Sequence, residues 1–209
     1  MLPEDGNSLQ SVSIGFIMSK RDAILAATLK LLAGKGFHGF SIKQVADAAG
    51  VAAGTVYLYF RDREHLIQEL HDEMTHYVLD KVSAGHDCNL SLFEQYQRIC
   101  LCFWQLFMQQ PDILLSKLQF DHLPSDPIRQ SAAECRKQFS PLSMLFESGR
   151  AQGVLKPLPN EILFVLGLEP CFALALKHIV GAVTINDEML ETVIRATWDG
   201  ICIRNPEPV

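Results

Sequence analysis

The seven histidines and six cysteines are the side chains of this sequence best suited to metal binding or to acid–base and nucleophilic catalysis. His71 and His76 lie five residues apart, not the four that place two ligands on one helical face, and no His-Glu-x-x-His pattern occurs. Cys100 and Cys102 would point to different sides of a helix. The sequence contains neither a Gly-x-Ser-x-Gly turn nor a glycine-rich phosphate loop. These spacings predict a protein that is not an enzyme and that needs no cofactor or metal.

A second group of side chains, in SIKQVADAAGVAAGTVYLYF (residues 41–60), is suited to contacting DNA. Ser41 followed by Gln44 forms a capping box, which predicts the start of a short helix. Gly50 would end that helix, because glycine adopts a positive φ at little cost. A second short helix follows, with Val56 facing inward. Two short helices joined by a glycine turn predict a helix-turn-helix, whose second helix enters the major groove; an ordinary pair of packed helices is the alternative.

Composition and charge are compatible with this interpretation. The chain has 209 residues, 48% of them apolar, and a net charge of −6, whereas residues 18–70 hold seven basic and five acidic side chains. A small basic module joined to a larger acidic one is typical of a nucleic-acid reader with a regulatory body. The longest apolar stretch, residues 162–185, is interrupted by charged residues and proline, and Glu4 and Asp5 stand where a signal peptide would be basic. We therefore expect a cytoplasmic protein that does not bind membranes.

The elements that position these residues are predicted to be helices throughout. Ser19-x-x-Asp22 caps a first helix that ends at residues 34–36, and its apolar residues recur at helical spacing: Ile24, Ala27, Thr28, Leu31 and Leu32. Strand patterns are absent. Further helices are predicted at Leu66–Val78, Leu90–Gln109, Asp112–His122, Asp126–Gln152, Asn160–Gly181 and Asn186–Ile203. The fold class is all-α, and residues 1–17 are predicted to be a flexible arm.

Residues 21–70, RDAILAATLKLLAGKGFHGFSIKQVADAAGVAAGTVYLYFRDREHLIQEL, closely resemble the DNA-binding domain of the tetracycline-repressor (TetR) family. The segment FESGRAQGVLKPL (residues 146–158) resembles the same family more weakly. The resemblance implies an all-α homodimer that binds a palindromic operator in double-stranded DNA. It divides the chain into the arm 1–17, a three-helix DNA-binding domain over 18–64 and a helical effector-binding and dimerisation domain over 65–209.

The resemblance also implies which residues meet DNA: Ser41, Lys43, Gln44, Ala52, Ala53, Thr55, Tyr57, Tyr59, Arg61 and Arg63. Lysine and arginine neutralise phosphate, and hydroxyl groups and helix N-termini form hydrogen bonds with it. Ala52 and Ala53 can contact a thymine methyl group but form no hydrogen bonds through their side chains. Val45, Val56 and Leu58 are predicted to be core.

Several aromatic and polar side chains of the second domain are candidates for an effector site: Phe103, Phe107, Phe120, His122, Phe139, Glu169, Phe172 and His178. An ordinary helical core would contain the same aromatic residues. Glu169 stands in an apolar segment next to Pro170, so it is either the polar anchor of an apolar cavity or a solvent-facing residue at a helix kink. A carboxylate in the cavity would favour a cationic or hydroxyl-bearing lipophilic compound over a fatty-acid-like anion.

We therefore predict a repressor released from its operator by a small, largely apolar molecule of unknown identity. The alternative is a DNA-binding adaptor whose second domain binds a protein. Dimerisation is predicted in the last two helices, from the apolar residues 162–183 and from a stripe on the final helix: Met189, Val193, Ile194, Trp198 and Ile201.

Overall fold

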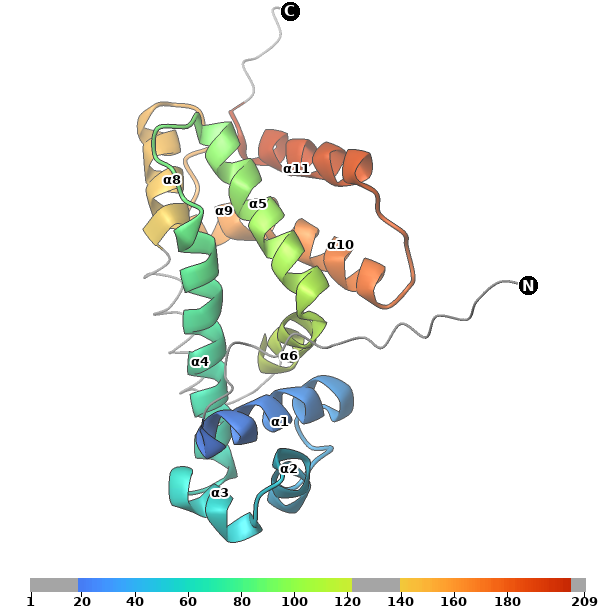
Figure 1. Ribbon diagram of the computed structural model, residues 1–209. Coiled ribbons are helices and arrows are strands. Elements are labelled where there is room, and N and C mark those ends of the chain that lie inside the picture. Colours follow the sequence, from blue (N-terminus) through green and yellow to red (C-terminus); the bar gives the residue numbers. More distant parts are fainter. Residues whose placement is uncertain (1–18, 122–139, 204–209) are drawn as a thin grey trace, which may run out of the picture.

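The computed structural model describes residues 19–121 and 140–203 and is helical through most of both ranges (Figure 1). The helices are α1 (Lys20–Lys35), α2 (Ile42–Ala49), α3 (Ala53–Tyr59), α4 (Arg63–Ala84), α5 (Leu92–Gln109), α6 (Pro111–Asp121), α8 (Ser140–Ala151), α9 (Asn160–Gly167), α10 (Glu169–Ile179) and α11 (Asp187–Ile201). Within the described ranges, the β pairing is limited to one isolated bridge, between Leu155 and Cys202. The predicted all-α fold is confirmed.

One predicted helix differs from the structure, and another is described only in part. The predicted helix over 160–181 is two helices, because α9 ends at Gly167 and α10 begins at Glu169. Pro170 lies in the first turn of α10, where its missing N–H group costs no helical hydrogen bond. The predicted helix over 126–152 is described only from Ser140, and its earlier part lies outside the described residues.

The first three helices form a small unit, called the head here (residues 19–60), whose apolar residues belong to the continuous core of the protein. Ile24 and Leu32 of α1, Val45 of α2 and Val56 of α3 are fully buried. Their positions follow the apolar spacing of the sequence, since one face of each amphipathic helix must be removed from water. The head is therefore a folded platform that fixes the directions in which α2 and α3 present their other faces.

Local signals set the angle between α2 and α3. The Ser41 side chain accepts a hydrogen bond from the backbone N–H of Gln44 (3.3 Å), and the Gln44 side chain accepts one from the backbone N–H of Ser41 (2.9 Å). At the other end of α2, Gly50 has φ 68° and ψ 33°, and the N–H of Val51 reaches back to the carbonyl of Ala46 (3.0 Å). This is the Schellman arrangement, in which a left-handed residue ends a helix. The capping box and the glycine turn predicted from the sequence are both confirmed.

Helix α4 connects the head to the remaining helices, called the body here (residues 85–203) (Figure 1). With 22 residues it is ~33 Å long. Arg21 of α1 donates hydrogen bonds to Glu69 (2.6 Å) and Glu73 (2.7 Å) of α4. Partial burial alone would lower the pKa of Arg21, but the hydrogen bonds and charges of the two carboxylates raise it overall. The predicted boundary between residues 64 and 65 falls inside α4, so the two parts share one continuous helix.

The body is organised around α5, which packs against α4, α6, α8, α10 and α11. The hydroxyl of Tyr96 donates to the carbonyl of Gly167 (2.9 Å) and lies 2.7 Å from the Thr197 hydroxyl, which joins α5, α9 and α11. Burial raises the pKa of the Tyr96 phenol, so the group stays neutral in this network.

The α11 stripe predicted for dimerisation is largely wrong. Its members Ile194, Trp198 and Ile201 are buried within their own subunit.

Replacing Gly50 by alanine should destabilise the protein through backbone strain alone. A Cβ atom at this position would meet no other atom within 4 Å, but φ is +68°. The expected loss is about 1–2 kcal/mol in the free energy of unfolding. Urea denaturation followed by circular dichroism, at one fixed protein concentration, measures it.

Gly34→Ala is the matched control, because this glycine lies inside α1, has no positive φ and also has open space around it. It should leave the stability unchanged or raise it by up to about 1 kcal/mol. Equal stability changes for the two variants would contradict the left-handed turn.

Candidate DNA-binding surface and ligand cavity

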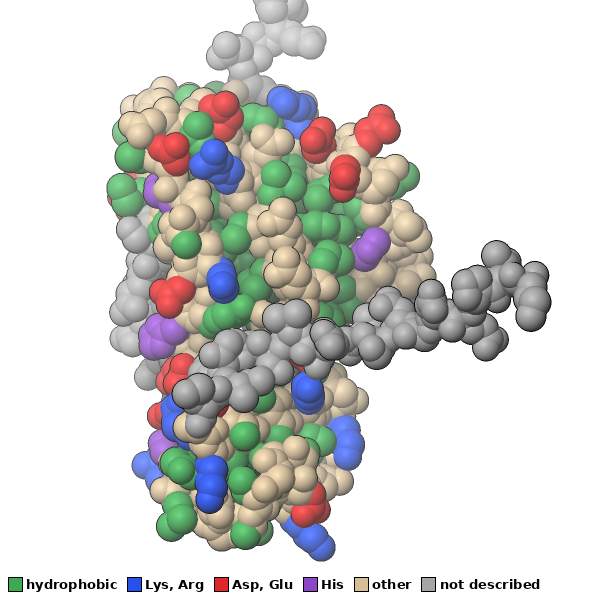
Figure 2. All heavy atoms as spheres, viewed as in Figure 1, with side chains coloured by type: hydrophobic (Ala, Val, Ile, Leu, Met, Phe, Trp, Pro, Cys, Tyr) green, Lys and Arg blue, Asp and Glu red, His purple; other side chains and the backbone are tan. Residues whose placement is uncertain are grey.

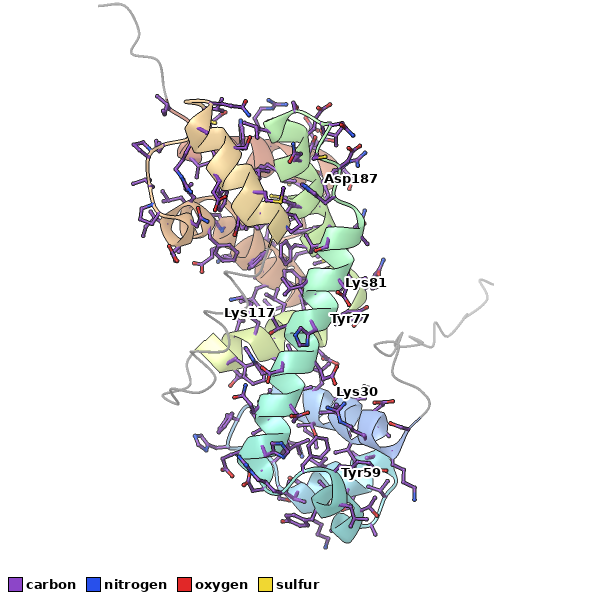
Figure 3. All side chains as sticks on the ribbon, turned by 90° about the vertical axis from the view of Figure 1, so that its left-hand side faces the viewer. Lys30, Tyr59, Tyr77, Lys81, Lys117 and Asp187 are labelled. Carbon is purple, nitrogen blue, oxygen red and sulfur yellow. The ribbon has the colours of Figure 1, made fainter. Side chains whose placement is uncertain are left out.

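The exposed side chains of α2 and α3 form one surface at the end of the head. Ser41, Lys43 and Gln44 are exposed at the start of α2, and Ala52 and Ala53 are exposed at the start of α3. The Gln44 oxygen is already used in the cap of α2, which leaves its amide nitrogen for other partners. In Figure 3, Tyr59 lies on the head, far from Asp187 of the body. The structure thus leaves these predicted residues exposed on the two short helices of the head.

Helix α3 presents a row of large side chains outward. Tyr57 is 55% exposed, Tyr59 is 42% exposed and Leu58 is 83% exposed, while Val56 is fully buried. The expectation that Leu58 is core is wrong. Each helical residue turns by about 100°, so two residues after the inward Val56 the chain faces away from the core. The sequence therefore carried the signal that Leu58 belongs to the outer face with the predicted tyrosines. Thr55 is partly exposed beside them.

The two arginines that follow α3 have different surroundings. Arg61 is exposed, with its side-chain nitrogen 3.3 Å from the carboxylate of Asp62. The guanidinium of Arg63 lies over the rings of Phe37 and Phe40, 4.7 Å from each ring centre, and donates to the carbonyl of Phe37. These contacts hold the connection between α1 and α2 against the start of α4. Arg61 is therefore the more accessible of the pair for a phosphate, whereas Arg63 makes these contacts within the protein.

Charge is distributed as DNA binding requires. On the face shown in Figure 2, Lys and Arg side chains are spread over the head, whereas the acidic side chains of the body gather at its far end. A basic module on an acidic protein directs approach to DNA through the head.

A cavity of about 540 Å³ lies in the body, lined by residues of α4, α5, α6, α8, α9 and α10. Five of the predicted effector residues line it: Phe103, Phe107, Phe120, Glu169 and Phe172. Three of these rings touch, with centre-to-centre distances of 4.8 Å between Phe103 and Phe172 and 5.1 Å between Phe107 and Phe172. This size suits a drug-sized molecule, and such sites are mostly apolar with a few polar groups.

The other predicted effector residues are not part of the described wall. His178 does not line the cavity, because its ring packs on Trp104 (5.4 Å between centres) and its Nδ1 accepts the backbone N–H of Ile185 (3.0 Å). It serves to hold the α10–α11 connection. His122 and Phe139 lie outside the described residues.

The cavity has polar wall residues besides the predicted Glu169, and the sequence did not indicate them. Glu147, Glu161 and Glu169 line it from three helices and are exposed at its edge. The ammonium group of Lys117 on α6 lies 5.8 Å from the ring centre of Phe172, and Figure 3 shows this lysine near the junction of head and body. His71 of α4 also lines the cavity and is only 7% exposed. Because these side chains converge from separate helices, no spacing in the sequence could have grouped them.

A helix-turn-helix head joined through one long helix to an all-helical body with a cavity is the architecture of a ligand-responsive DNA-binding regulator. Residues 24–70 match the model of bacterial regulatory proteins of the tetR family, and residues 91–202 match a tetracyclin repressor-like C-terminal domain. The chain belongs to the TetR family of transcriptional regulators.

Three relatives show how far the similarity extends. A TetR-family regulator from Vibrio parahaemolyticus is 38% identical, with a TM-score of 0.78 over 89% of this chain and all of that one. An uncharacterized HTH-type transcriptional regulator of Haemophilus influenzae is 28% identical over 86% of this chain and 94% of its own length. The fold is also that of FadR from Bacillus subtilis in complex with stearoyl-CoA, which is 18% identical with a TM-score of 0.72 over 86% of this chain and 98% of that one.

Lys43→Ala and Arg61→Ala should weaken DNA binding in different ways. If Lys43 contacts a base, its loss should cost about 1–3 kcal/mol on the specific site and little on other DNA. Loss of a phosphate contact at Arg61 should weaken binding to all sequences and reduce the slope of log K against log salt by about 0.9. Fluorescence anisotropy over a salt series measures both, on fragments first selected from genomic DNA.

Arg63→Ala is the control for the second effect. It should lower the stability of the head, because two aromatic rings and a carbonyl lose their partner, and it should leave the salt slope unchanged. A reduced slope for Arg63→Ala with a normal slope for Arg61→Ala would reverse our assignment.

Proposed function

We propose that the protein is a transcriptional repressor that binds a palindromic operator as a homodimer and leaves it when a small, largely apolar molecule enters the body. One observation carries this proposal: α6 packs against α1 of the head and also lines the cavity. A helix with these two contacts joins ligand binding to the position of the DNA-binding helices. The protein would act in the cytoplasm, where the operator is.

The contacts of α6 supply a physical route for this coupling. Ile113, Lys117 and Phe120 line the cavity. Between them in sequence, the fully buried Ser116 donates to the carbonyl of Leu29 in α1 (3.5 Å). A ligand that shifts α6 must also shift α1, because closely packed surfaces transmit displacement. The ligand changes operator affinity only by its different affinity for the two states, typically ~1–3 kcal/mol.

An exposed apolar face supports the homodimer. Ile162 is 44% exposed, Val165 is 47% and Leu166 is 43% on α9, and Val180 beyond α10 is 61% exposed. The segment Asn160–Ile179 is long and apolar enough to cross a membrane, and only 33% of its most apolar part is buried inside the protein. Its exposed apolar side chains therefore need a partner. We assign the face to a second subunit and not to a membrane, because the same two helices carry the charged residues Glu161, Glu169 and Lys177. A symmetric contact here gives the two-fold axis that a palindromic site requires.

The cavity wall supports an apolar effector that carries a cation or a hydroxyl group. Its base is aromatic, and the three carboxylates at its edge would repel an anion. Glu169 is our candidate for the anchor, since it adjoins the aromatic wall through Phe172 one turn further along α10. An acyl-CoA, the kind of molecule bound by the Bacillus subtilis FadR structure, is the competing candidate. The volume of the cavity favours a small molecule over the protein partner of an adaptor.

Val165→Asp should convert the dimer into a monomer of 23.4 kDa. Placing a carboxylate in an apolar interface removes it from water without a partner, which costs several kcal/mol per subunit. Sedimentation velocity at micromolar concentration measures the mass, and His76→Glu, on an exposed position of α4, is the control that should stay dimeric. A wild-type protein that is monomeric and still binds operator tightly would refute the homodimer.

Glu169→Gln should weaken the response to lipophilic cations and leave operator affinity unchanged. Because Glu169 is exposed, the expected loss in affinity for dodecyltrimethylammonium is only about two- to fivefold. Calorimetric titration below the micelle concentration measures the affinity. The control is Glu191→Gln, on the exposed side of α11 and away from the cavity. Unchanged binding of the cation, or tighter binding of dodecanoyl-CoA than of any cation, would count against Glu169 as the anchor.

A further inference from the structure

His71 is a buried polar side chain in the wall of the cavity. It belongs to α4, is 7% exposed, and meets the ring of Phe120 edge to face at 4.9 Å between ring centres. The ring of Phe120 also lines the cavity. An imidazole in such a place must satisfy two ring nitrogens, since a buried polar atom without a hydrogen-bond partner destabilises the fold.

One of the two nitrogens has a partner on its own helix. Nδ1 lies 3.3 Å from Oδ1 of Asp72, and the same oxygen accepts a hydrogen bond from the side chain of Gln68 (3.0 Å). An ionised carboxylate only accepts hydrogen bonds, so Nδ1 carries the proton in this pair. In the tautomer with the proton on Nδ1, the imidazole offers a lone pair at Nε2, as it does wherever a carboxylate orients a histidine.

The second nitrogen faces no protein partner. No hydrogen bond joins Nε2 to another residue in the described ranges, and Thr75, one turn along α4, uses its hydroxyl to donate to the His71 carbonyl (2.8 Å). Among the described residues, the fully buried side-chain atom without a hydrogen-bond partner is Oε1 of Gln110, not Nε2 of His71. Because His71 lines the cavity, Nε2 is the ring nitrogen that is left for a ligand there.

We propose that Nε2 of His71 accepts a hydrogen bond from the effector, and that the effector is an apolar molecule whose polar end carries hydrogen-bond donors, such as a primary ammonium or a hydroxyl group. The inference rests on the proposed function and narrows its ligand class. Other residues that line the cavity agree with it, because Glu147, Glu161 and Glu169 add further acceptors at its edge. Lys117 is the cationic exception, with its ammonium group beside the ring of Phe172.

The position of His71 also relates the contact to DNA binding. His71 lies between Glu69 and Glu73, the two residues of α4 that hold Arg21 of the head. A ligand that engages His71 therefore acts on the turn of α4 to which α1 is attached. Contact between His71 and the polar end of the ligand would affect the position of the head, while the aromatic wall binds the apolar part of the ligand.

Four dodecyl compounds separate the roles of charge and of hydrogen-bond donors. Dodecylammonium has both, dodecanol has a donor only, dodecyltrimethylammonium has a charge only, and dodecanoate has neither a donor nor a positive charge. We expect the full-length protein to bind dodecylammonium most tightly and dodecanoate most weakly in calorimetric titrations below the micelle concentrations.

His71→Phe keeps a ring against Phe120 and removes the acceptor. It should weaken dodecylammonium and dodecanol about three- to tenfold, the range expected for one hydrogen bond, and leave dodecyltrimethylammonium unchanged. Met74→Leu, which changes an apolar wall residue of the same helix, should not alter the ratio between these compounds. Because each ratio is taken within one variant, a general loss of stability does not affect it. If the phenylalanine variant fails to fold, His71→Leu and the wild-type ranking give the same comparison.

The outcomes distinguish this inference from the proposed function. Equal weakening of all four compounds by His71→Phe, or a wild-type preference for dodecyltrimethylammonium over dodecylammonium, overturns the role of His71. Binding of dodecanoyl-CoA with no binding of the donor-bearing compounds overturns the ligand class. In either case, specific binding of genomic DNA fragments by the ligand-free protein, and their release by whichever compound binds, tests the repressor proposal independently.

Discussion

The packing of α6 between α1 and the cavity is the contact on which the rest of the structure depends. One face of this short helix is buried against the head, where Ser116 reaches the backbone of α1. Another face supplies Ile113 and Phe120 to the cavity wall. The apolar residues of the head belong to one continuous core with those of the body, and the caps of α2 set its angle to α3. What the body adds is a position for the whole head, and α6, together with the ion pairs of Arg21 on α4, sets that position.

The head could be predicted from the sequence almost residue by residue, because its structure is set by local chemistry. A capping box, a glycine at a left-handed position and a helical apolar spacing each act over a few residues, so the printed order of Ser41, Gln44, Gly50 and Val56 is sufficient. Leu58 is the exception there. Its apolar side chain suggests burial, but its position on the helix, two residues after the buried Val56, turns it toward solvent. The contacts of Arg63 with Phe37 and Phe40 could not be predicted in this way, because both rings lie more than twenty residues earlier in the chain.

The cavity was only half predictable, for the same physical reason. An abundance of phenylalanine indicated an apolar interior, and Phe103, Phe107, Phe120 and Phe172 do line one cavity. Which polar groups enter it depends on how six helices meet, and that is decided by packing over long sequence distances. The sequence therefore drew attention to His178 and not to His71. The α11 stripe failed similarly, because an apolar face is equally able to bury itself in its own subunit or in a partner.

The exposed face of α3 has one more consequence. Leu58, Ala52 and Ala53 present methyl and methylene groups where a polar recognition helix would present hydrogen-bond donors. In the major groove such groups distinguish bases by the methyl group at position 5 of thymine. Cytosine methylated at position 5 carries the same group at the same place. A helix that recognises bases in this way would respond to the methylation state of its operator, so the affinity of the regulator for DNA would depend on epigenetic marks as well as on base sequence.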